Sequence, residues 1–299
     1  MTMTTQALMP KFLARNGWRA SHAALAVGFA LAGVLLTFEA WADLVRIALK
    51  DEEASHALLV PIVVAWLVWV RRGRLRHCRP VGQWVGPVIT LFGAGIYLLG
   101  EARLIESFWH GGAILVAAGC FLTVAGKQVL RAFLPVLFVL MFLVPVPGRI
   151  RQQMAIPLQR TTARMTQGAC DVAGISIDRT GNLLRINGVD VAVAEACNGM
   201  RMTFALVLVS YAFAFTTPLH GYVRVLLVVL SPLSAVLCNV IRLVPTVWVF
   251  GNFPAEVAEQ FHDLSGWVML FVGFLLLMMV IRLLRWFAVP VTPFSLAHG

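Results

Sequence analysis

Long apolar stretches, most of them close to the length that crosses a bilayer, recur along almost all of this 299-residue chain. Charged residues make up 13% of the chain, about half the share of a typical soluble domain. The sequence therefore predicts an all-α polytopic membrane protein with about eight transmembrane helices. The predicted spans are 23–41, 57–70, 84–100, 110–125, 132–146, 202–216, 223–243 and 264–286. A further apolar patch at 243–250 is too short to span, and is either re-entrant or the end of the seventh helix.

Basic residues orient these spans. With the N-terminus in the cytoplasm, 13 of the 24 Lys and Arg residues and none of the 14 acidic residues fall on the cytoplasmic side. Short cytoplasmic loops are enriched in Lys and Arg, so we expect both termini in the cytoplasm. The net charge of +10 then predicts attachment to anionic membrane lipid rather than to nucleic acid. The thirteen residues are Lys11, Arg15, Arg19, Arg71, Arg72, Arg74, Arg76, Arg79, Lys127, Arg131, Arg224, Arg282 and Arg285.

Residues 147–196 form the longest stretch outside the predicted spans. The mixture of apolar and basic side chains in 149–173 is typical of an amphipathic helix on a membrane surface, which Pro157 would bend or divide. Alternating apolar residues, with turn signals at 180–182 and at Asn187-Gly188, then predict two or three short strands. We expect one membrane domain over 1–299, with 147–196 as an extracytoplasmic insertion.

A polar run at 195–201 interrupts the apolar pattern just before the sixth predicted span. It contains Glu195, Cys197, Asn198 and Arg201, and such groups are costly at membrane depth unless they serve a function. A strand that leads into a helix would place the Cys197 thiol near the positive end of the helix dipole, which favours the reactive thiolate. The alternative is that Cys197 is a small packing residue.

Arg242 and His262 are the two other candidates for chemistry. Successive spans alternate in direction, so Arg242 at the outer end of span seven and His262 at the start of span eight share a level with Cys197. A thiol attacks a carbonyl to form a thioester, a histidine transfers protons, and an arginine stabilises the oxyanion. The alternatives are a snorkelling arginine and an interfacial histidine.

The other cysteines give no sign of a metal site. The chain has five cysteines, no CxxC pair and no metal-ligand spacing, so neither a metal nor a cofactor is predicted. Only Cys170 and Cys197 are predicted outside the cytoplasm. They form either a disulfide or two separate thiols.

Four blocks in chain order together resemble one family, the exosortases and archaeosortases. They are SHALLVP at 55–61, EACNGMR at 195–201, NVIR at 239–242 and HDLSG at 262–266. His262 favours the bacterial branch, and Asn198 stands where Ser is commoner in the family.

The resemblance implies a cysteine transpeptidase or protease in the bacterial inner membrane, with its active site on the extracytoplasmic side. Its expected substrates are exported proteins with a C-terminal sorting signal: a Pro-Glu-Pro-like motif, a transmembrane helix and a basic tail. Bacterial members often accompany exopolysaccharide production. Cys197 matches the nucleophile, Arg242 the basic partner and His262 the proton-transfer residue. Possible supporting residues are Glu195, Asn198, Arg201, Asn239 and His56, the last at a family position without an assigned role.

Two other functions fit parts of the pattern. A membrane acyltransferase would use the same thiol or histidine on a lipid or polysaccharide. A transporter or scaffold of an exopolysaccharide export complex would also be polytopic. Transporters usually place polar groups near the midplane and show internal repeats, whereas here the polar groups gather at one edge and no repeat is visible.

Overall fold

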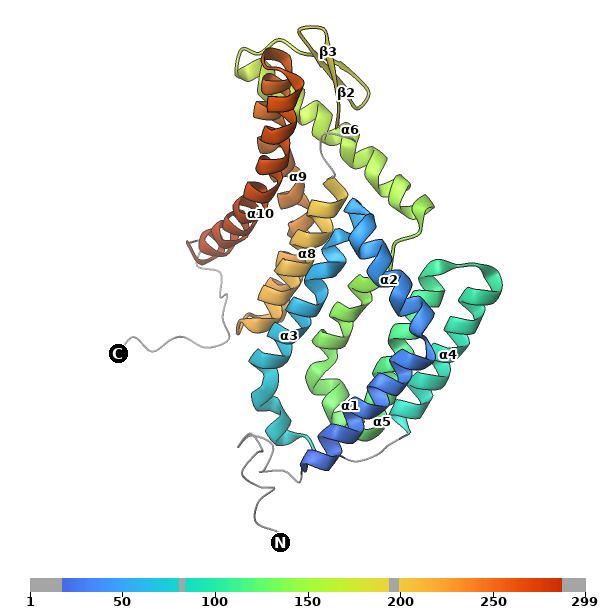
Figure 1. Ribbon diagram of the computed structural model, residues 1–299. Coiled ribbons are helices and arrows are strands. Elements are labelled where there is room, and N and C mark those ends of the chain that lie inside the picture. The colour runs from blue at the N-terminus through green and yellow to red at the C-terminus, as the bar shows by residue number, and fades with distance from the viewer. Residues whose placement is uncertain (1–17, 81–83, 194–198, 287–299) are drawn as a thin grey trace. The chain divides into compact units, whose positions relative to one another are not determined.

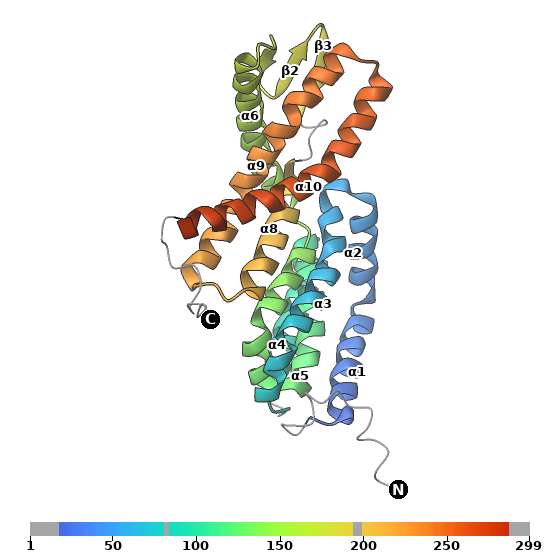
Figure 2. The same ribbon diagram turned by 90° about the vertical axis from the view of Figure 1, so that its left-hand side faces the viewer.

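The computed structural model describes residues 18–80, 84–193 and 199–286 (Figures 1 and 2). The chain divides into two compact units, Met1–Pro147 and Gly148–Gly299. The described secondary structure is helical except for one three-stranded sheet in the second unit. The predicted fold class, a polytopic all-α membrane protein with a small β element, is confirmed.

The first unit begins with two helices joined at a sharp bend. Helix α1 (Ala20–Leu36) and helix α2 (Phe38–Lys50) meet at an angle of 81°. The bend lies at Thr37, whose Oγ1 donates to the carbonyl oxygen of Gly33 at 2.9 Å. A hydroxyl that bonds the carbonyl four residues back competes with the backbone ladder and bends helices. The predicted first span, 23–41, therefore covers most of α1 and the first turn of α2, on both sides of the bend.

The rest of the first unit is a set of antiparallel helices. Its elements are η2 (Glu52–Leu58), α3 (Leu59–Arg71), η3 (Arg72–His77), α4 (Val85–Arg103), α5 (Glu106–Leu140) and η4 (Met141–Leu143). Element α5 reverses direction at Gly126, which has φ 79° and ψ 176°. Ser107, near the start of α5, accordingly donates to the carbonyl oxygen of Pro145, beyond its end, at 2.7 Å. The predicted spans 110–125 and 132–146 correspond to its two limbs.

Glycines bring α4 and the first limb of α5 into backbone contact. Gly86, Gly93 and Gly100 recur every seven residues on α4 and are all buried. A Cβ added to Gly93 would lie 2.8 Å from Leu115 Cβ, and one added to Gly100 would overlap the backbone of Trp109. Small residues allow this close approach, which replaces the hydrophobic driving force that is missing between helices in lipid.

The second unit combines a surface helix, the sheet and three apolar helices. They are α6 (Gly148–Val172), β1 (Asp178–Thr180), β2 (Leu183–Ile186), β3 (Val189–Ala192), α8 (Gly199–Thr216), α9 (Gly221–Asn252) and α10 (Ala255–Trp286). Helix α6 continues through Pro157 without dividing. The strands pair antiparallel in the order β1-β2-β3. Asn187 and Gly188 both have positive φ, as a two-residue hairpin turn requires, which confirms the turn predicted there.

The sheet packs on the C-terminal part of α9, and Figures 1 and 2 show it there beside α6. Asn187 Nδ2 donates to the carbonyl oxygen of Gly251 at 3.1 Å. The shared core is formed by Ala163, Cys170, Ile177, Leu184, Ile186, Val191, Val193, Leu243 and Val247. The C-terminal part of α9 is therefore packed against the sheet.

That packing explains the structure of the short apolar patch at 243–250. The patch continues α9, so it is the end of the seventh helix and not a re-entrant loop. Arg242 consequently lies inside a 32-residue helix that continues past the predicted end of span seven. The physical reason is that Leu243 and Val247 bury their side chains against the sheet, which stabilises this part of the helix.

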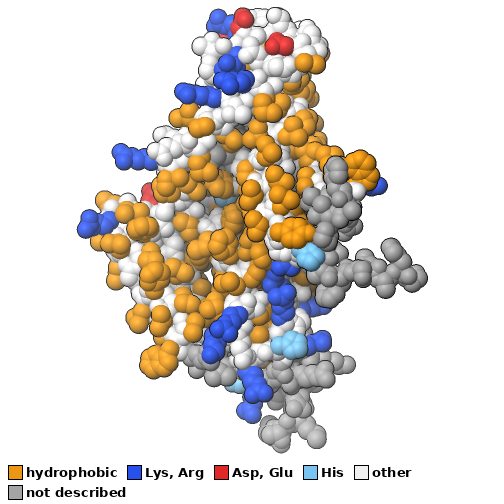
Figure 3. All heavy atoms as spheres, turned by 180° about the vertical axis from the view of Figure 1, so that it is seen from behind, with side chains coloured by type: hydrophobic (Ala, Val, Ile, Leu, Met, Phe, Trp, Pro, Cys, Tyr) orange, Lys and Arg blue, Asp and Glu red, His pale blue; other side chains and the backbone are white. Residues whose placement is uncertain are grey.

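Five of the described helices are long and apolar enough to cross a membrane, or six if α1 and α2 form one bent span. A shorter apolar helix covers Met202–Thr216. The predicted number of eight spans is not confirmed by this count, in which α5 counts once although it reverses. Large apolar side chains are exposed on most helices, and they cover much of the face in Figure 3. The chain is a multi-pass membrane protein.

The glycine contacts give a test of the first unit. Gly100→Ala places a methyl group against the backbone of Trp109, and such overpacking costs about 1–3 kcal/mol. Gly95→Ala, in the same helix, meets nothing within 4 Å and serves as the control. We expect the midpoint temperature of thermal unfolding in detergent to fall for Gly100→Ala only. Equal midpoints for the two variants would show that α4 and α5 do not pack as described.

Candidate active site

Arg242 is the centre of the candidate site. Its side chain is only 5% exposed, although it is charged. Its Nε donates to Ser265 Oγ at 2.9 Å, and its Nη2 donates to the carbonyl oxygen of His262 at 2.8 Å. Ser265 Oγ in turn donates to the same carbonyl oxygen at 2.7 Å. These bonds hold the guanidinium between α9 and α10.

The antiparallel pairing of α9 and α10 explains why these residues meet. Arg242 lies about three turns before the end of α9, and Ser265 lies about three turns after the start of α10. Positions three and four apart share one helix face, so His262, Ser265 and Gly266 all lie on the side of α10 toward Arg242. A Cβ on Gly266 would lie 3.4 Å from Arg242 Nη2, so glycine leaves room for the guanidinium.

The burial of Arg242 has an energetic consequence. A buried charge is costly unless it is hydrogen-bonded, and the bonds to α10 supply that compensation. Arginine also keeps its charge at any working pH. The arrangement therefore provides a permanent positive charge in a fixed position, which suits the stabilisation of an oxyanion.

Asn239, one turn before Arg242, contributes an unused acceptor. It is 4% exposed, and its Oδ1 has no hydrogen-bond partner among the described residues. A buried polar atom without a partner costs roughly 1–3 kcal/mol, which is unusual in a stable helix. An acceptor is thus available close to Arg242 for a donor that the described residues do not supply.

The predicted nucleophile lies outside the described residues. Cys197, Glu195 and Asn198 fall in the segment 194–198, and Arg201 lies in the first turn of α8. On one side of the segment, Val193 belongs to the core that includes Leu243. On the other side, α8 packs against α9. Both flanks therefore belong to the unit that holds Arg242 and His262.

Cys170 does not compete for the role of nucleophile. It is a free, fully buried thiol in the core between α6 and the sheet, so the structure contains no disulfide at Cys170. Burial, with a smaller contribution from Asp171, raises the pKa of this thiol. A raised pKa keeps it in the unreactive protonated form.

The sequence of the chain was compared with models of known protein families. The family model of the transmembrane exosortases matches residues 41–279. This chain belongs to the transmembrane exosortase family. No curated protein and no solved structure matches it. The predicted family is therefore confirmed, and the matched range of this exosortase includes every candidate site residue that the sequence predicted.

His56 lies in the other unit of the exosortase. It belongs to η2 and is half-buried.

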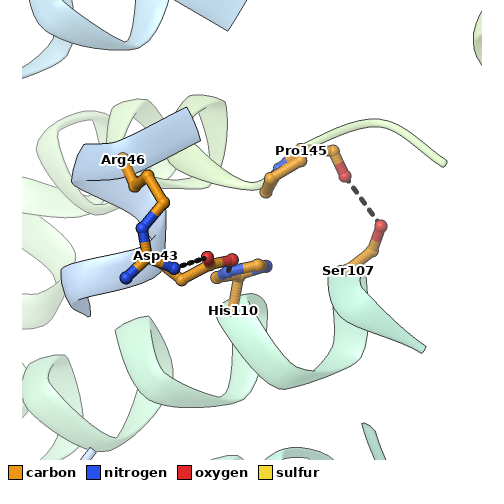
Figure 4. A network of polar contacts seen from close by, with 5 residues as sticks. All are labelled: Asp43, Arg46, Ser107, His110 and Pro145. Carbon is orange, nitrogen blue, oxygen red and sulfur yellow. Dashed lines mark hydrogen bonds and ion pairs between the residues drawn. The ribbon is translucent and has the colours of Figure 1, made fainter. Parts of the chain in front are cut away.

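Sequence reasoning missed a second polar cluster, which lies in the first unit (Figure 4). His110 is completely buried, and its Nε2 lies 3.2 Å from Asp43 Oδ2. Arg46 Nη1 binds the other carboxylate oxygen of Asp43 at 3.0 Å. His110 Nδ1 is buried without a partner among the described residues. A histidine near the start of a predicted span was the available signal, because ionisable groups are rare at membrane depth.

Ser265 and Gly266 were also missed as members of the candidate site. Both stand in the HDLSG block, but their part becomes visible only when α10 is set against α9. The spacing of three and four residues after His262 was the signal for one helix face.

The Asp43–His110 pair gives a test of the first unit of this exosortase. Asp43→Ala leaves a buried imidazole without its acceptor, which costs roughly 1–3 kcal/mol. Glu39→Ala, which removes an exposed carboxylate one turn before Asp43, is the matched control. We expect only Asp43→Ala to lower the midpoint of thermal unfolding. An equal decrease of the unfolding midpoint in both variants would contradict the pairing of Asp43 with His110.

Proposed function

We propose that this exosortase is a cysteine transpeptidase in which Cys197 is the nucleophile, Arg242 stabilises the oxyanion and His262 transfers protons. The observation that carries the proposal is the buried guanidinium of Arg242, which is hydrogen-bonded to Ser265 and to the backbone of His262. A charge that is fixed before the reaction needs no reorganisation when the oxyanion forms.

In the first step, the Cys197 thiolate attacks the carbonyl carbon of the scissile peptide bond. The negative charge that develops on the carbonyl oxygen is stabilised by Arg242. The carbon–nitrogen bond then breaks, and the leaving amine takes a proton from His262. The products are a thioester on Cys197 and a released C-terminal fragment.

In the second step, an acceptor attacks the thioester. His262 accepts the proton of the incoming water, amine or hydroxyl, the carbon–sulfur bond breaks, and Cys197 leaves as the thiolate. Exclusion of water would favour transfer over hydrolysis, and we propose that α6 and the sheet, which pack on the part of α9 after Arg242, limit the access of water.

The proposed substrates are exported proteins with a C-terminal sorting signal: a Pro-Glu-Pro-like motif, a transmembrane helix and a basic tail. An apolar surface for lateral docking of such a helix is available on α10, where exposed apolar residues follow helical spacing at Leu264, Val268, Phe271 and Leu275. This surface is on the face of α10 opposite to the one that carries Ser265 and Gly266. The proposed location is the bacterial inner membrane, with both termini in the cytoplasm and the site on the extracytoplasmic side.

The nucleophile is tested by Cys197→Ala in a strain that co-expresses a tagged protein with such a sorting signal. We expect processing to stop, because the proposed thioester forms on the Cys197 sulfur, while the variant still inserts in the membrane. Cys170→Ala is the control and should process normally, since that thiol is buried in the core. Normal processing by Cys197→Ala would overturn the proposal. Mass spectrometry of Cys197 separates a peptide thioester from the fatty acyl group that an acyltransferase would carry.

The positioning of Arg242 is tested by Ser265→Ala. Loss of the bond to Nε frees the guanidinium to move, and we expect thioester formation to slow about tenfold, whereas Arg242→Lys should slow it about a hundredfold. Ser265→Thr keeps the hydroxyl and should restore most of the rate. Ser210→Ala, which removes a buried hydroxyl bonded within α8, is the control. Equal rates of thioester formation in Ser265→Ala and Ser210→Ala would show that Ser265 does not position Arg242.

A further inference from the structure

A cavity of about 450 Å³ lies in the second unit between α8 and α10. The described residues that line it are Phe213, Met278, Ile281 and Arg282, and of these only the arginine is polar. It borders a core formed by the C-terminal part of α8, the first turns of α9 and the last turns of α10. Its volume falls in the usual range of ligand pockets.

A second arginine lies at the same core. Arg224, in the first turn of α9, places its guanidinium carbon 5.4 Å from the ring centre of Phe215, which packs against this core. The Nε of Arg224 is buried and has no acceptor among the described residues. A buried donor of a charged group without an acceptor is costly, so the position favours an acceptor from outside these helices.

The helices themselves supply no countercharge at this end. The sequence contains no Asp or Glu in 199–255 or in 264–299. On α10 the acidic residue nearest in sequence to Arg282 is Asp263, roughly 28 Å away along the helix. The acidic residues of the sheet, Asp178 and Asp190, lie on strands that pack on the opposite end of α9.

We propose that this cavity binds one anionic phospholipid, with an acyl chain between α8 and α10 and the phosphate at Arg224 and Arg282. The apolar wall fits the chain, and the two arginines fit the phosphate, because arginine binds phosphate through paired hydrogen bonds. A basic peptide tail is repelled by the same charges. The site is independent of the proposed peptide chemistry, and it is a defined binding site rather than the general attraction of a basic surface to anionic lipid.

The site is tested on the full-length protein after removal of bound lipid. Native mass spectrometry would measure the binding of dioleoylphosphatidylglycerol and of dioleoylphosphatidylcholine. We expect the anionic lipid to bind more tightly, and Arg224→Gln and Arg282→Gln each to weaken its binding about fivefold. Arg74→Gln, which removes an exposed arginine of η3, is the control and should leave the affinity unchanged.

A second variant tests the apolar part. Met278→Trp fills the cavity without a change of charge, and we expect it to weaken the binding of both lipids. Equal affinity of the unaltered protein for the two lipids, or full affinity in both arginine variants, would overturn the proposal. So would release of the lipid by millimolar inorganic phosphate, because that result identifies a phosphate site without a part for the acyl chain.

Discussion

The hydrogen bonds of Arg242 across α9 and α10 are the interaction on which the candidate site depends. A guanidinium that is 5% exposed needs partners, and it finds them on the facing turn of α10, at Ser265 Oγ and the carbonyl oxygen of His262. The same bonds fix the turn that carries the His262 side chain. The two groups proposed to handle negative charge and protons are therefore positioned together, by one register of two long helices.

That register needs support from the part of α9 that follows Arg242. Leu243 and Val247 bury their side chains in the core of the small sheet, and Asn187 binds the carbonyl oxygen of Gly251 near the end of the helix. The insertion thus does more than cover a surface, because it stabilises the helix end beyond Arg242. Within the helix, Pro232 removes one backbone donor, and the hydroxyl of Ser231 donates to the carbonyl oxygen of Val228 at 2.7 Å in its place.

Local sequence signals predicted the helical class, the family and the Asn187-Gly188 turn, since each rests on composition or on adjacent residues. The bends at Thr37 and Gly126 were not predicted, because one hydroxyl bond or one positive φ leaves the apolar pattern unchanged. The end of α9 was left open between two alternatives for another reason. An apolar side chain such as Leu243 looks the same in sequence whether lipid or a sheet covers it. The pairing of His110 with Asp43 joins residues 67 positions apart, so no short pattern contains it.

The arginines of α9 and α10 divide into two kinds by the source of their partners. Arg242 receives hydrogen-bond acceptors from α10, so its geometry exists before any ligand binds. The Nε of Arg224 is buried without an acceptor among the described residues, and Arg282 faces a cavity whose other walls are apolar. An arginine that is satisfied internally can act on a transient charge, because no stable ligand is needed to hold it. An arginine that is not satisfied internally favours a permanent anion, and in a membrane the abundant anion with an apolar part is a phospholipid.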